Sequence, residues 1–313
     1  MAFGSKKPLK ELKAIFIAAP REMSAKRFTQ LIREYLPQGN IVLGISAEPH
    51  VLGFEGQAQF EMLPAASVQP IIDKVAASGA TNKVYTLEYS QRDLPYILEK
   101  VRFKQVLLVN GSWKYSFHLH PAYYVLAQSG TPFTYVSPFY DEDEARAYEK
   151  AKQKHVIRPS VKIGEKYKES ELLGVVTDAA RSSYDYSSQV GVVLAKKRQG
   201  KYRLMAWAHN KVVPYQTYAM HHGASREQNF SPANDLGHYD TVHAETMLVL
   251  GSRQLNFDLA GTTLFINVLP CPSCARLLTQ TDIHEIVYSE DHSEGYAVKL
   301  LEASGKKVRR VVL

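Results

Sequence analysis

Short apolar runs alternate with amphipathic stretches through the first half of the chain. Buried strands are expected at residues 14–20, 41–45, 83–87, 105–109 and 133–136. Helices are expected between them, at residues 24–36, 68–78, 93–100 and 121–128. Strands that alternate with helices predict a mostly parallel sheet with helices on both faces. We therefore expect an α/β fold whose residues 1–155 form a Rossmann-like, doubly wound accessory domain of unknown ligand.

The second half has a different order of elements. Residues 141–154 run from acidic to basic, as suits a solvated helix, and residues 156–168, with Pro159 and Gly164, read as a linker. Further elements follow in the order helix 171–181, strands 189–195 and 202–209, helix from 243, strand 261–268, helix from 271, strand 285–288, helix 295–304 and strand 307–312. This order predicts a three-layer α/β/α domain over residues 169–313. Residues 215–239 lack a strong periodicity and are expected to form either a lid or an ordered surface loop, with the loop slightly favoured.

Two short motifs in this second half carry the clearest chemistry. They are Thr241-Val-His-Ala-Glu-Thr246 and Leu269-Pro-Cys-Pro-Ser-Cys-Ala275, which holds the chain's only 2 cysteines. His243, Cys271 and Cys274 make one imidazole and two thiolates, a set suited to a catalytic zinc ion with a fourth position open for water. Glu245 lies close enough to reach that water without binding the metal. The two motifs therefore predict a zinc site with a neighbouring general acid and base.

Each motif alone has a simpler explanation. A lone Cys-x-x-Cys pair is often a redox pair or half of a structural zinc site, and a lone histidine is more often a core or surface residue. However, Cys271 and Cys274 open an expected helix, which places both sulfurs on one face and in a first turn that favours thiolates. The expected strand at 261–268 would bring both motifs to one end of a sheet. The combination favours the catalytic zinc site.

Composition narrows the class of protein. The 313 residues are 45% hydrophobic and 22% charged, as in a globular protein of about two domains. There is no apolar run long enough to span a bilayer and no signal-peptide pattern at the start, and both cysteines are assigned to metal. We therefore expect a cytoplasmic protein without membrane contact. The net charge of +7 is spread over both halves, which suits phosphate-bearing ligands but is weak support for nucleic-acid binding.

The first domain offers few candidate ligand residues. It has no glycine-rich dinucleotide or P-loop motif. Arg21 follows the first strand and could meet a phosphate, although an ordinary solvated turn is the commoner role. His118 and His120 follow the strand at 105–109, where sites form in such sheets, but isolated histidines are more often packing or surface residues.

The second half resembles the cytidine and deoxycytidylate deaminase superfamily, and within it the deoxycytidylate deaminase branch. The pattern His-x-Glu followed by Pro-Cys-x-x-Cys is a zinc deaminase signature. The resemblance covers about residues 170–313 and also includes Arg181-Ser-Ser, Gln189-Val-Gly-Val-Val, His209-Asn210 and Thr281-Asp-Ile-His-Glu-Ile-Val-Tyr288. One departure lies at Ala208-His-Asn-Lys-Val-Val-Pro214, where the family usually has glycines around the asparagine.

The resemblance implies hydrolytic deamination of a cytosine nucleotide, most simply dCMP to dUMP. It implies that Zn²⁺ bound by His243, Cys271 and Cys274 supplies the hydroxide that attacks C4, while Glu245 shuttles the protons. Asn210 matches the asparagine that hydrogen-bonds the sugar, and the backbone of Ala244 matches a contact to the base edge. The resemblance also implies assembly into a homo-oligomer.

Two other functions remain open. A deaminase that edits cytosine or adenine in RNA or DNA would need a focused basic groove with exposed aromatic residues, which the even charge disfavours. A zinc-bound regulatory or scaffold protein without turnover would not need Glu245. The exact substrate, the ligand of the first domain, any allosteric effector and the oligomeric state are not determined by the sequence.

Overall fold

The structure is a computed structural model, and it describes residues 2–3, 13–18, 20–232, 235, 237–292 and 295–312. The chain forms two compact units, and each is built from two separate segments. The first unit comprises Met1–Lys154 and Thr217–Tyr239, and the second comprises His155–Gln216 and Asp240–Leu313. Residues 217–239 therefore belong to the first unit, whereas the sequence predicted a continuous second domain over residues 169–313.

A six-stranded sheet forms the centre of the first unit, with the strand order β1-β4-β3-β2-β5-β6. Strands β2 to β6 are mutually parallel, and β1 is antiparallel to β4. The strands are β1 (Ala2–Phe3), β2 (Ile15–Ala18), β3 (Ile41–Ser46), β4 (Val84–Tyr89), β5 (Gln105–Val109) and β6 (Phe133–Val136). The helices between and after them are α1 (Ala25–Tyr35), α2 (Ala65–Ala77), α3 (Leu94–Lys100), α4 (Pro121–Ser129) and α5 (Glu142–Lys152).

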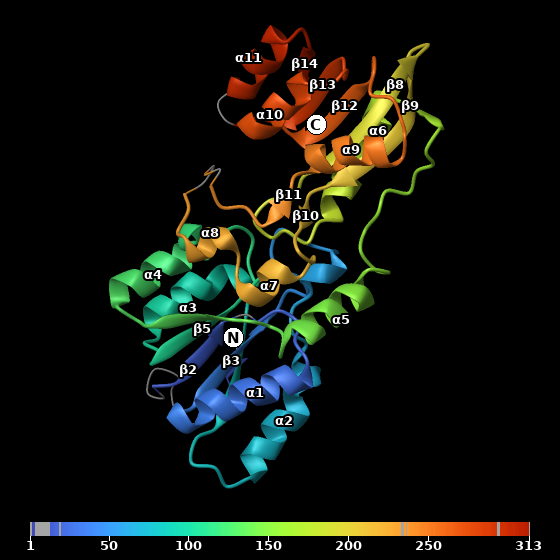
Figure 1. Ribbon diagram of the computed structural model, residues 1–313. Coiled ribbons are helices and arrows are strands. Elements are labelled where there is room, and N and C mark those ends of the chain that lie inside the picture. The colour runs from blue at the N-terminus through green and yellow to red at the C-terminus, as the bar shows by residue number, and fades with distance from the viewer. Residues whose placement is uncertain are drawn as a thin grey trace. The chain divides into compact units, whose positions relative to one another are not determined.

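Helices cover both faces of this sheet, with α1 and α2 together and α3 beside α4 (Figure 1). The strands β2 and β3 are buried on both faces, which explains their nearly continuous apolar sequences. Ile15 and Ile17 pack with Leu31 of α1 in one core cluster. Phe16 points to the opposite face, as strand alternation requires, and stacks on Phe103 with ring centroids 4.5 Å apart.

The second unit has a six-stranded mixed sheet, with the strand order β14-β13-β12-β8-β9-β7. Strands β12, β13 and β14 are parallel to one another, and β8 is antiparallel to both of its neighbours. The strands are β7 (Lys166–Tyr167), β8 (Gly191–Arg198), β9 (Lys201–His209), β12 (Thr263–Val268), β13 (Glu285–Glu290) and β14 (Lys307–Arg310). The helices are α6 (Glu169–Arg181), α9 (Ala244–Gln254), α10 (Pro272–Thr279) and α11 (Tyr296–Ala303).

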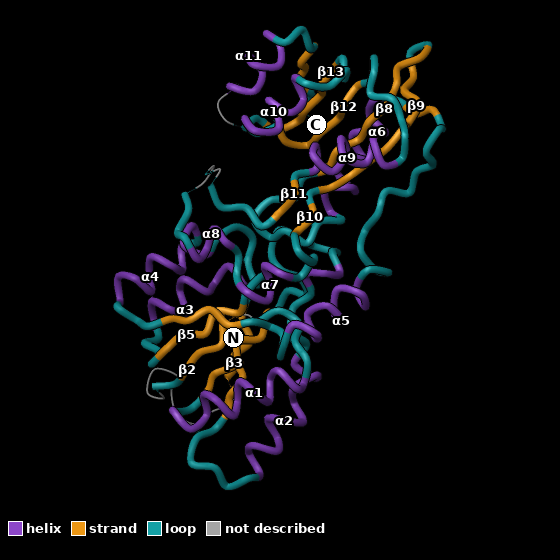
Figure 2. The backbone as a smooth tube through the Cα atoms, viewed as in Figure 1, coloured by secondary structure: helices purple, strands orange, loops and turns teal. Residues whose placement is uncertain are grey.

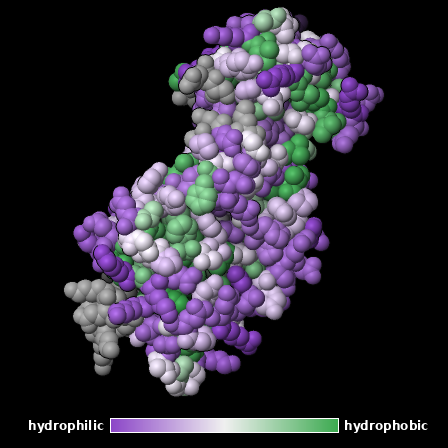
Figure 3. Space-filling view, turned by 60° about the vertical axis from the view of Figure 1, so that its left-hand side comes forward, coloured by the Kyte–Doolittle hydropathy of each residue, from purple (hydrophilic) through white to green (hydrophobic). Residues whose placement is uncertain are grey.

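Two apolar clusters show that this second unit has three layers. Alternate residues of the central strands face opposite sides, so that Val193 and Phe265 pack against α6 while Val192 and Ile266 pack against α9, α10 and α11. Helix α6 approaches β8 so closely that a Cβ atom at Gly191 would overlap the α6 backbone. The face drawn in Figure 3 is mostly hydrophilic, with apolar side chains in scattered patches. Every helix in the described part of the chain is too short or too polar to cross a membrane.

One segment of the second half of the chain belongs to the first unit. It begins and ends next to a small two-stranded ribbon. Strand β10 (Lys211–Val212) pairs antiparallel with β11 (Thr241–Val242), and both are drawn as short strands in Figure 2. Residues 217–239, which we call the insertion, contain the helices α7 (Tyr218–His222) and α8 (Ser225–Gln228).

The insertion packs into the first unit. The Oγ1 atom of Thr217 donates a 2.8 Å hydrogen bond to the carbonyl oxygen of Ala145, and the Nε1 atom of Trp113 donates a 2.6 Å bond to Glu227. Met220 and Glu227 are almost fully buried. The prediction of a surface loop is therefore wrong for the insertion, because the insertion completes the core of the first unit.

The expected strands and helices of both units correspond to the observed ones, within a few residues at their ends. The sequence did not predict β1, β7, β10, β11, α7 or α8, all of which are six residues or shorter. Strand β7 lies inside the predicted linker and pairs with β9. Short elements of this kind carry too few residues for a periodic pattern, so that tertiary pairing decides their structure.

Candidate active site

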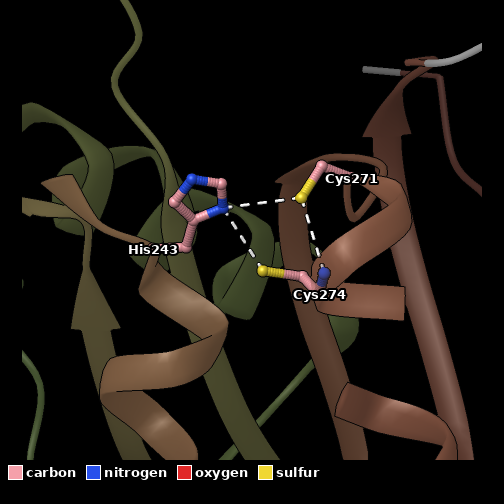
Figure 4. A group of neighbouring side chains, drawn as sticks. All are labelled: His243, Cys271 and Cys274. Atoms are coloured by element: carbon pink, nitrogen blue, oxygen red, sulfur yellow. Dashed lines mark hydrogen bonds between the residues drawn. The ribbon is translucent and has the colours of Figure 1, made fainter. Parts of the chain in front are cut away.

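Two helix N-termini bring the zinc-ligand candidates together. His243 is the N-cap residue of α9, directly after β11, and Cys271 is the N-cap residue of α10, shortly after β12. Cys274 lies in the first turn of α10, and its backbone N–H group donates to the Cys271 sulfur over 3.5 Å. Figure 4 shows the imidazole ring facing both sulfur atoms. The free N–H groups of a helix N-terminus favour thiolates, so that the local fold prepares the cysteines for metal binding.

The distances among these three side chains fit a zinc ion. The Nδ1 atom of His243 lies 3.6 Å from the Cys271 sulfur and 3.3 Å from the Cys274 sulfur, and all three ligand atoms lie within 4.8 Å of one another. In a tetrahedral site with ordinary zinc bond lengths, nitrogen and sulfur ligands are about 3.6 Å apart. Among the described residues, the metal-binding group has these three members, which leaves room for a fourth, non-protein ligand. The three residues therefore fit the zinc ion that the sequence predicted.

The protonation of the group points to the same conclusion. A hydrogen bond from the Cys274 thiol, together with one from His243, lowers the pKa of Cys271 to about 4. The same bond to Cys271, together with burial, raises the pKa of Cys274, because Cys274 is the donor. The lowered pKa favours Cys271 as a thiolate ligand, and a bound cation would also favour the thiolate form of Cys274.

Glu245 lies beside this group in the first turn of α9. Its side chain is only 3% exposed, and its carboxyl group interacts with Cys274. Burial raises the pKa of Glu245 above the ordinary value for a glutamic acid. A buried carboxyl group with a raised pKa, next to a metal-ligand set, is suited to accept and return protons.

Asn210 directly follows β9, and its side chain makes hydrogen bonds within its own unit. The Nδ2 atom donates to the Asp185 carboxylate at 3.1 Å and to the Ser188 carbonyl oxygen at 2.8 Å. The Oδ1 atom accepts the N–H group of Val190 at 2.9 Å. Asn210 therefore holds residues 185–190 in place beside the start of β8, and only its oxygen can accept another bond.

Sequence comparisons identify this part of the chain. Residues 166–290 match the family described as the cytidine and deoxycytidylate deaminase zinc-binding region. These residues are therefore similar to the cytidine and deoxycytidylate deaminase superfamily. We call these residues the deaminase region, and it contains all three zinc-ligand candidates and Glu245.

Two curated relatives show how far the sequence similarity extends. An uncharacterized deaminase in the luxG 3′ region of Aliivibrio fischeri is 28% identical over 127 residues, which are 41% of this chain and 72% of that protein. A probable deoxycytidylate deaminase of Drosophila melanogaster is 28% identical over 116 residues, which are 36% of this chain and 54% of that protein. The chain thus spans about half the length of the Drosophila relative.

Among solved structures, the dCMP deaminase of cyanophage S-TIM5 in complex with dCMP and dUMP is similar to 46% of this chain. The match covers 96% of that chain, with 14% sequence identity and a TM-score of 0.34.

The remaining site residue predicted for the deaminase region is Ala244. It is the first residue of α9, directly after His243, and it is fully buried in the core cluster below the helix. Its backbone contact to a base remains a prediction.

The sequence analysis missed Asp185, whose carboxylate accepts hydrogen bonds from the backbone N–H group of Ser187, at 2.7 Å, and from the Asn210 amide. The sequence Asp185-Tyr-Ser-Ser188 has the form of an Asx turn, a signal that could have drawn attention to this residue.

The candidates of the first unit have structural contacts. Arg21 is fully buried, so the expected solvated turn is wrong, and its guanidinium donates to the Met220 sulfur at 2.9 Å and to the Tyr148 hydroxyl at 3.1 Å. The Nε2 atom of His118 lies 2.8 Å from the carbonyl oxygen of Ser231, which agrees with the expected packing role. His120 is the N-cap residue of α4.

Proposed function

We propose that the deaminase region hydrolyses a cytosine nucleotide, with dCMP as substrate and dUMP and ammonia as products. The observation that carries the proposal is the group of His243, Cys271 and Cys274 with the buried Glu245 carboxyl beside it. The Drosophila relative, named as a probable deoxycytidylate deaminase, supports the choice of nucleotide.

In this mechanism, His243, Cys271 and Cys274 would hold a zinc ion. A zinc ion in such a site supplies the positive charge that makes a water molecule acidic near neutral pH. Glu245 takes a proton from the attacking water and passes it to ring nitrogen N3, while the water oxygen adds to C4 of the cytosine. Glu245 then delivers the second water proton to the departing amino group, which leaves as ammonia. The burial of Glu245 suits this task, since it raises the pKa of the carboxyl group and so makes the group easier to protonate.

We propose that the substrate is held by Asn210 and by the backbone of Ala244. Because both N–H groups of the Asn210 amide are already used, the sugar contact would be a hydroxyl group that donates to Oδ1. Ala244 would present its backbone to the edge of the base at the start of α9. We further propose that the protein assembles into a homo-oligomer.

We also propose that the first unit is a Rossmann-like domain. Its parallel strands β2 to β6 follow the order β4-β3-β2-β5-β6, in which the chain moves outward from β2 and then returns to the other side of it. Doubly wound nucleotide-binding folds have this order.

A substrate panel with metal analysis tests the proposed function. Purified protein is assayed for bound zinc and for ammonia release from dCMP, dCTP, cytidine, single-stranded DNA and RNA. We expect one zinc per chain and turnover with dCMP above the other substrates. Turnover on polymers alone would replace dCMP by a nucleic-acid substrate. Full zinc occupancy without turnover on any of them would favour a regulatory or scaffold protein.

A further inference from the structure

The first unit contains a crevice that the deaminase function leaves unexplained. It is a cavity of about 170 Å³ at the carboxyl ends of β2 and β5. We call it the switch-point crevice, and it is lined by Ala18, Leu52, Gln91, Arg92, Leu94, Ser112, Trp113, Lys114, Phe117 and His120. We propose that this crevice binds a small anionic molecule that carries a flat ring, such as a phosphorylated aromatic or heterocyclic compound.

The position of the crevice supports a binding role independently of its lining. Strands β2 and β5 are hydrogen-bonded neighbours, and Ala18 pairs with Leu108 at the end of the register. After β2 the chain turns toward α1, and after β5 it enters the loop at residues 110–120, so that the two connections diverge. In open parallel sheets, ligands bind outside the carboxyl ends of the strands at this reversal of strand order.

The walls suit the flat part of a ligand. Leu52, Leu94, Trp113 and Phe117 give the cavity mostly apolar surfaces. The rings of Trp113 and Phe117 lie 4.8 Å apart between centroids, are inclined by 54° and form an aromatic corner, in which Phe117 is fully buried and Trp113 is 7% exposed. The exposed part of the indole can contact a planar ring by stacking or through its edge.

The charged residues at the crevice favour an anionic ligand. Lys114 and Arg92 are its charged residues, and none of the described residues that line it is acidic. The Lys114 ammonium lies over the rings of Phe54 and Tyr115, at 5.7 and 5.2 Å from their centroids, and it takes part in none of the ion pairs found among the described residues. Among the described residues, the ion pair of Arg92 is a 4.0 Å contact with the exposed Asp93. Lys114 also acts electrostatically on the Glu55 carboxyl group, which is not part of the crevice lining. Neither cation is held by a close, buried ion pair, so both can turn toward a phosphate or carboxylate group.

Two neutral donors also line the crevice. The Oγ atom of Ser112 accepts the backbone N–H group of Arg21 at 3.0 Å, which leaves the Ser112 hydroxyl hydrogen free to donate. The Nδ1 atom of His120 accepts the backbone N–H group of Ala122 at 3.1 Å. Burial lowers the pKa of His120, so the ring is neutral and carries its proton on Nε2. The lining thus offers hydrogen-bond donors, as an anion requires.

The insertion holds the aromatic corner rigid. Glu227 accepts the indole N–H group of Trp113 at 2.6 Å and the backbone N–H group of Phe117 at 3.1 Å. Glu227 belongs to α8 of the insertion. The insertion therefore fixes both aromatic residues before a ligand binds.

Fluorescence of Trp113 tests the binding proposal directly. The chain has 2 tryptophans, so Trp207→Phe leaves Trp113 as the only reporter. Three probes separate the two halves of the proposed ligand: phenyl phosphate has ring and charge, inorganic phosphate has charge alone, and benzyl alcohol has the ring alone. We expect a saturable change in Trp113 emission with phenyl phosphate, and at least about tenfold weaker binding of the other two. Added salt should weaken the binding of phenyl phosphate.

Variants of the two cations provide the decisive comparison. Lys114→Met together with Arg92→Met keeps the aliphatic stems and should weaken phenyl phosphate binding by about tenfold or more. The control is Lys74→Met, an exposed lysine on α2 outside the crevice, which should bind like the parent. Trp113 emission and circular dichroism without ligand show whether each variant is folded. Absence of a saturable signal in the parent, or equal binding by the doubly substituted protein and the parent, would overturn the proposal.

Discussion

The candidate sites of the two units lie at similar points of their sheets but consist of different kinds of residues. Cys271 follows the carboxyl end of β12, and the switch-point crevice lies at the carboxyl ends of β2 and β5. The zinc-ligand group consists of two buried cysteines and a half-buried histidine, which are fixed by two helix N-termini. The crevice has cationic and aromatic residues in its lining, and these residues come from four separate segments. The comparison indicates that the second unit is built for a reaction and the first for recognition of a ligand.

The largest expected effect comes from removal of a metal ligand. Cys271→Ser or Cys274→Ser replaces a thiolate by a weak oxygen ligand, so zinc should be lost and deaminase activity should fall by about a thousandfold or more. Zinc content and ammonia release measure both. Ser273→Ala, an exposed change within the same motif, is the control and should retain both properties. Full activity without bound zinc would show that the metal assignment is wrong.

Removal of the proton carrier should be nearly as severe but should spare the metal. Glu245→Gln keeps the shape of the side chain and removes its acid, so activity should fall by about a hundredfold to ten-thousandfold. Zinc content should stay at one per chain. Glu302→Gln, on the exposed side of α11, is the matched control. Near-parental turnover by the Glu245 variant would contradict the assigned role and favour another base.

A substitution in the insertion should damage the first unit. Glu227→Ala removes the acceptor for the Trp113 and Phe117 N–H groups, and two unsatisfied buried donors should lower the free energy of unfolding of this unit by about 2–4 kcal/mol. Urea unfolding followed by Trp113 emission in the Trp207→Phe background measures the loss. Glu227→Gln keeps one carbonyl oxygen as acceptor and should recover most of it. An unchanged transition in the alanine variant would mean that the insertion does not stabilise this unit.

Acid should destabilise the second unit at a higher pH than it destabilises the first. Burial, aided by Arg158 and Lys211, lowers the pKa of His209 from 6.5 to about 4. The unfolded chain therefore binds a proton first, and stability is lost as the pH falls from about 6.5 to about 4. The loss between neutral pH and about pH 5 should be about 2 kcal/mol. Unfolding followed by Trp207 emission in a Trp113→Phe background measures it, and His209→Gln should remove this part of the pH dependence.

Acid should destabilise the first unit by a smaller amount and at a lower pH. Burial alone would raise the pKa of Glu48, but hydrogen bonds from Ser90, Ser46 and the N–H group of Gln91 lower it from 4.5 to about 2. Its stabilisation is present above about pH 4.5 and is lost as the pH falls toward 2. The effect should be smaller than that of His209 because the Glu48 carboxylate is partly solvated. Trp113 emission in the Glu48→Gln variant tests this, and an identical acid transition in variant and parent would contradict it.

The ease with which each region can be predicted follows from its chemistry. Zinc demands particular residue types at short spacings, so His243, Glu245, Cys271 and Cys274 could be assigned from two motifs. The long strands and helices could be predicted because their apolar periodicity extends over many residues. The crevice could not, since Leu52, Arg92 and Lys114 are ordinary residues that only the strand order brings together. Arg21 and Glu227 are polar residues with buried partners far away in sequence, and no local pattern distinguishes them from surface residues.

The ribbon of β10 and β11 has a consequence for how this protein could have evolved. The chain leaves the second unit after Gln216 and re-enters it at Asp240, so neither unit corresponds to one uninterrupted stretch of the gene. A recombination event that exchanged residues 1–154 as a cassette would leave Trp113 without Glu227 and Arg21 without Met220. The two halves are therefore expected to have been inherited together and to vary together at these pairs of positions.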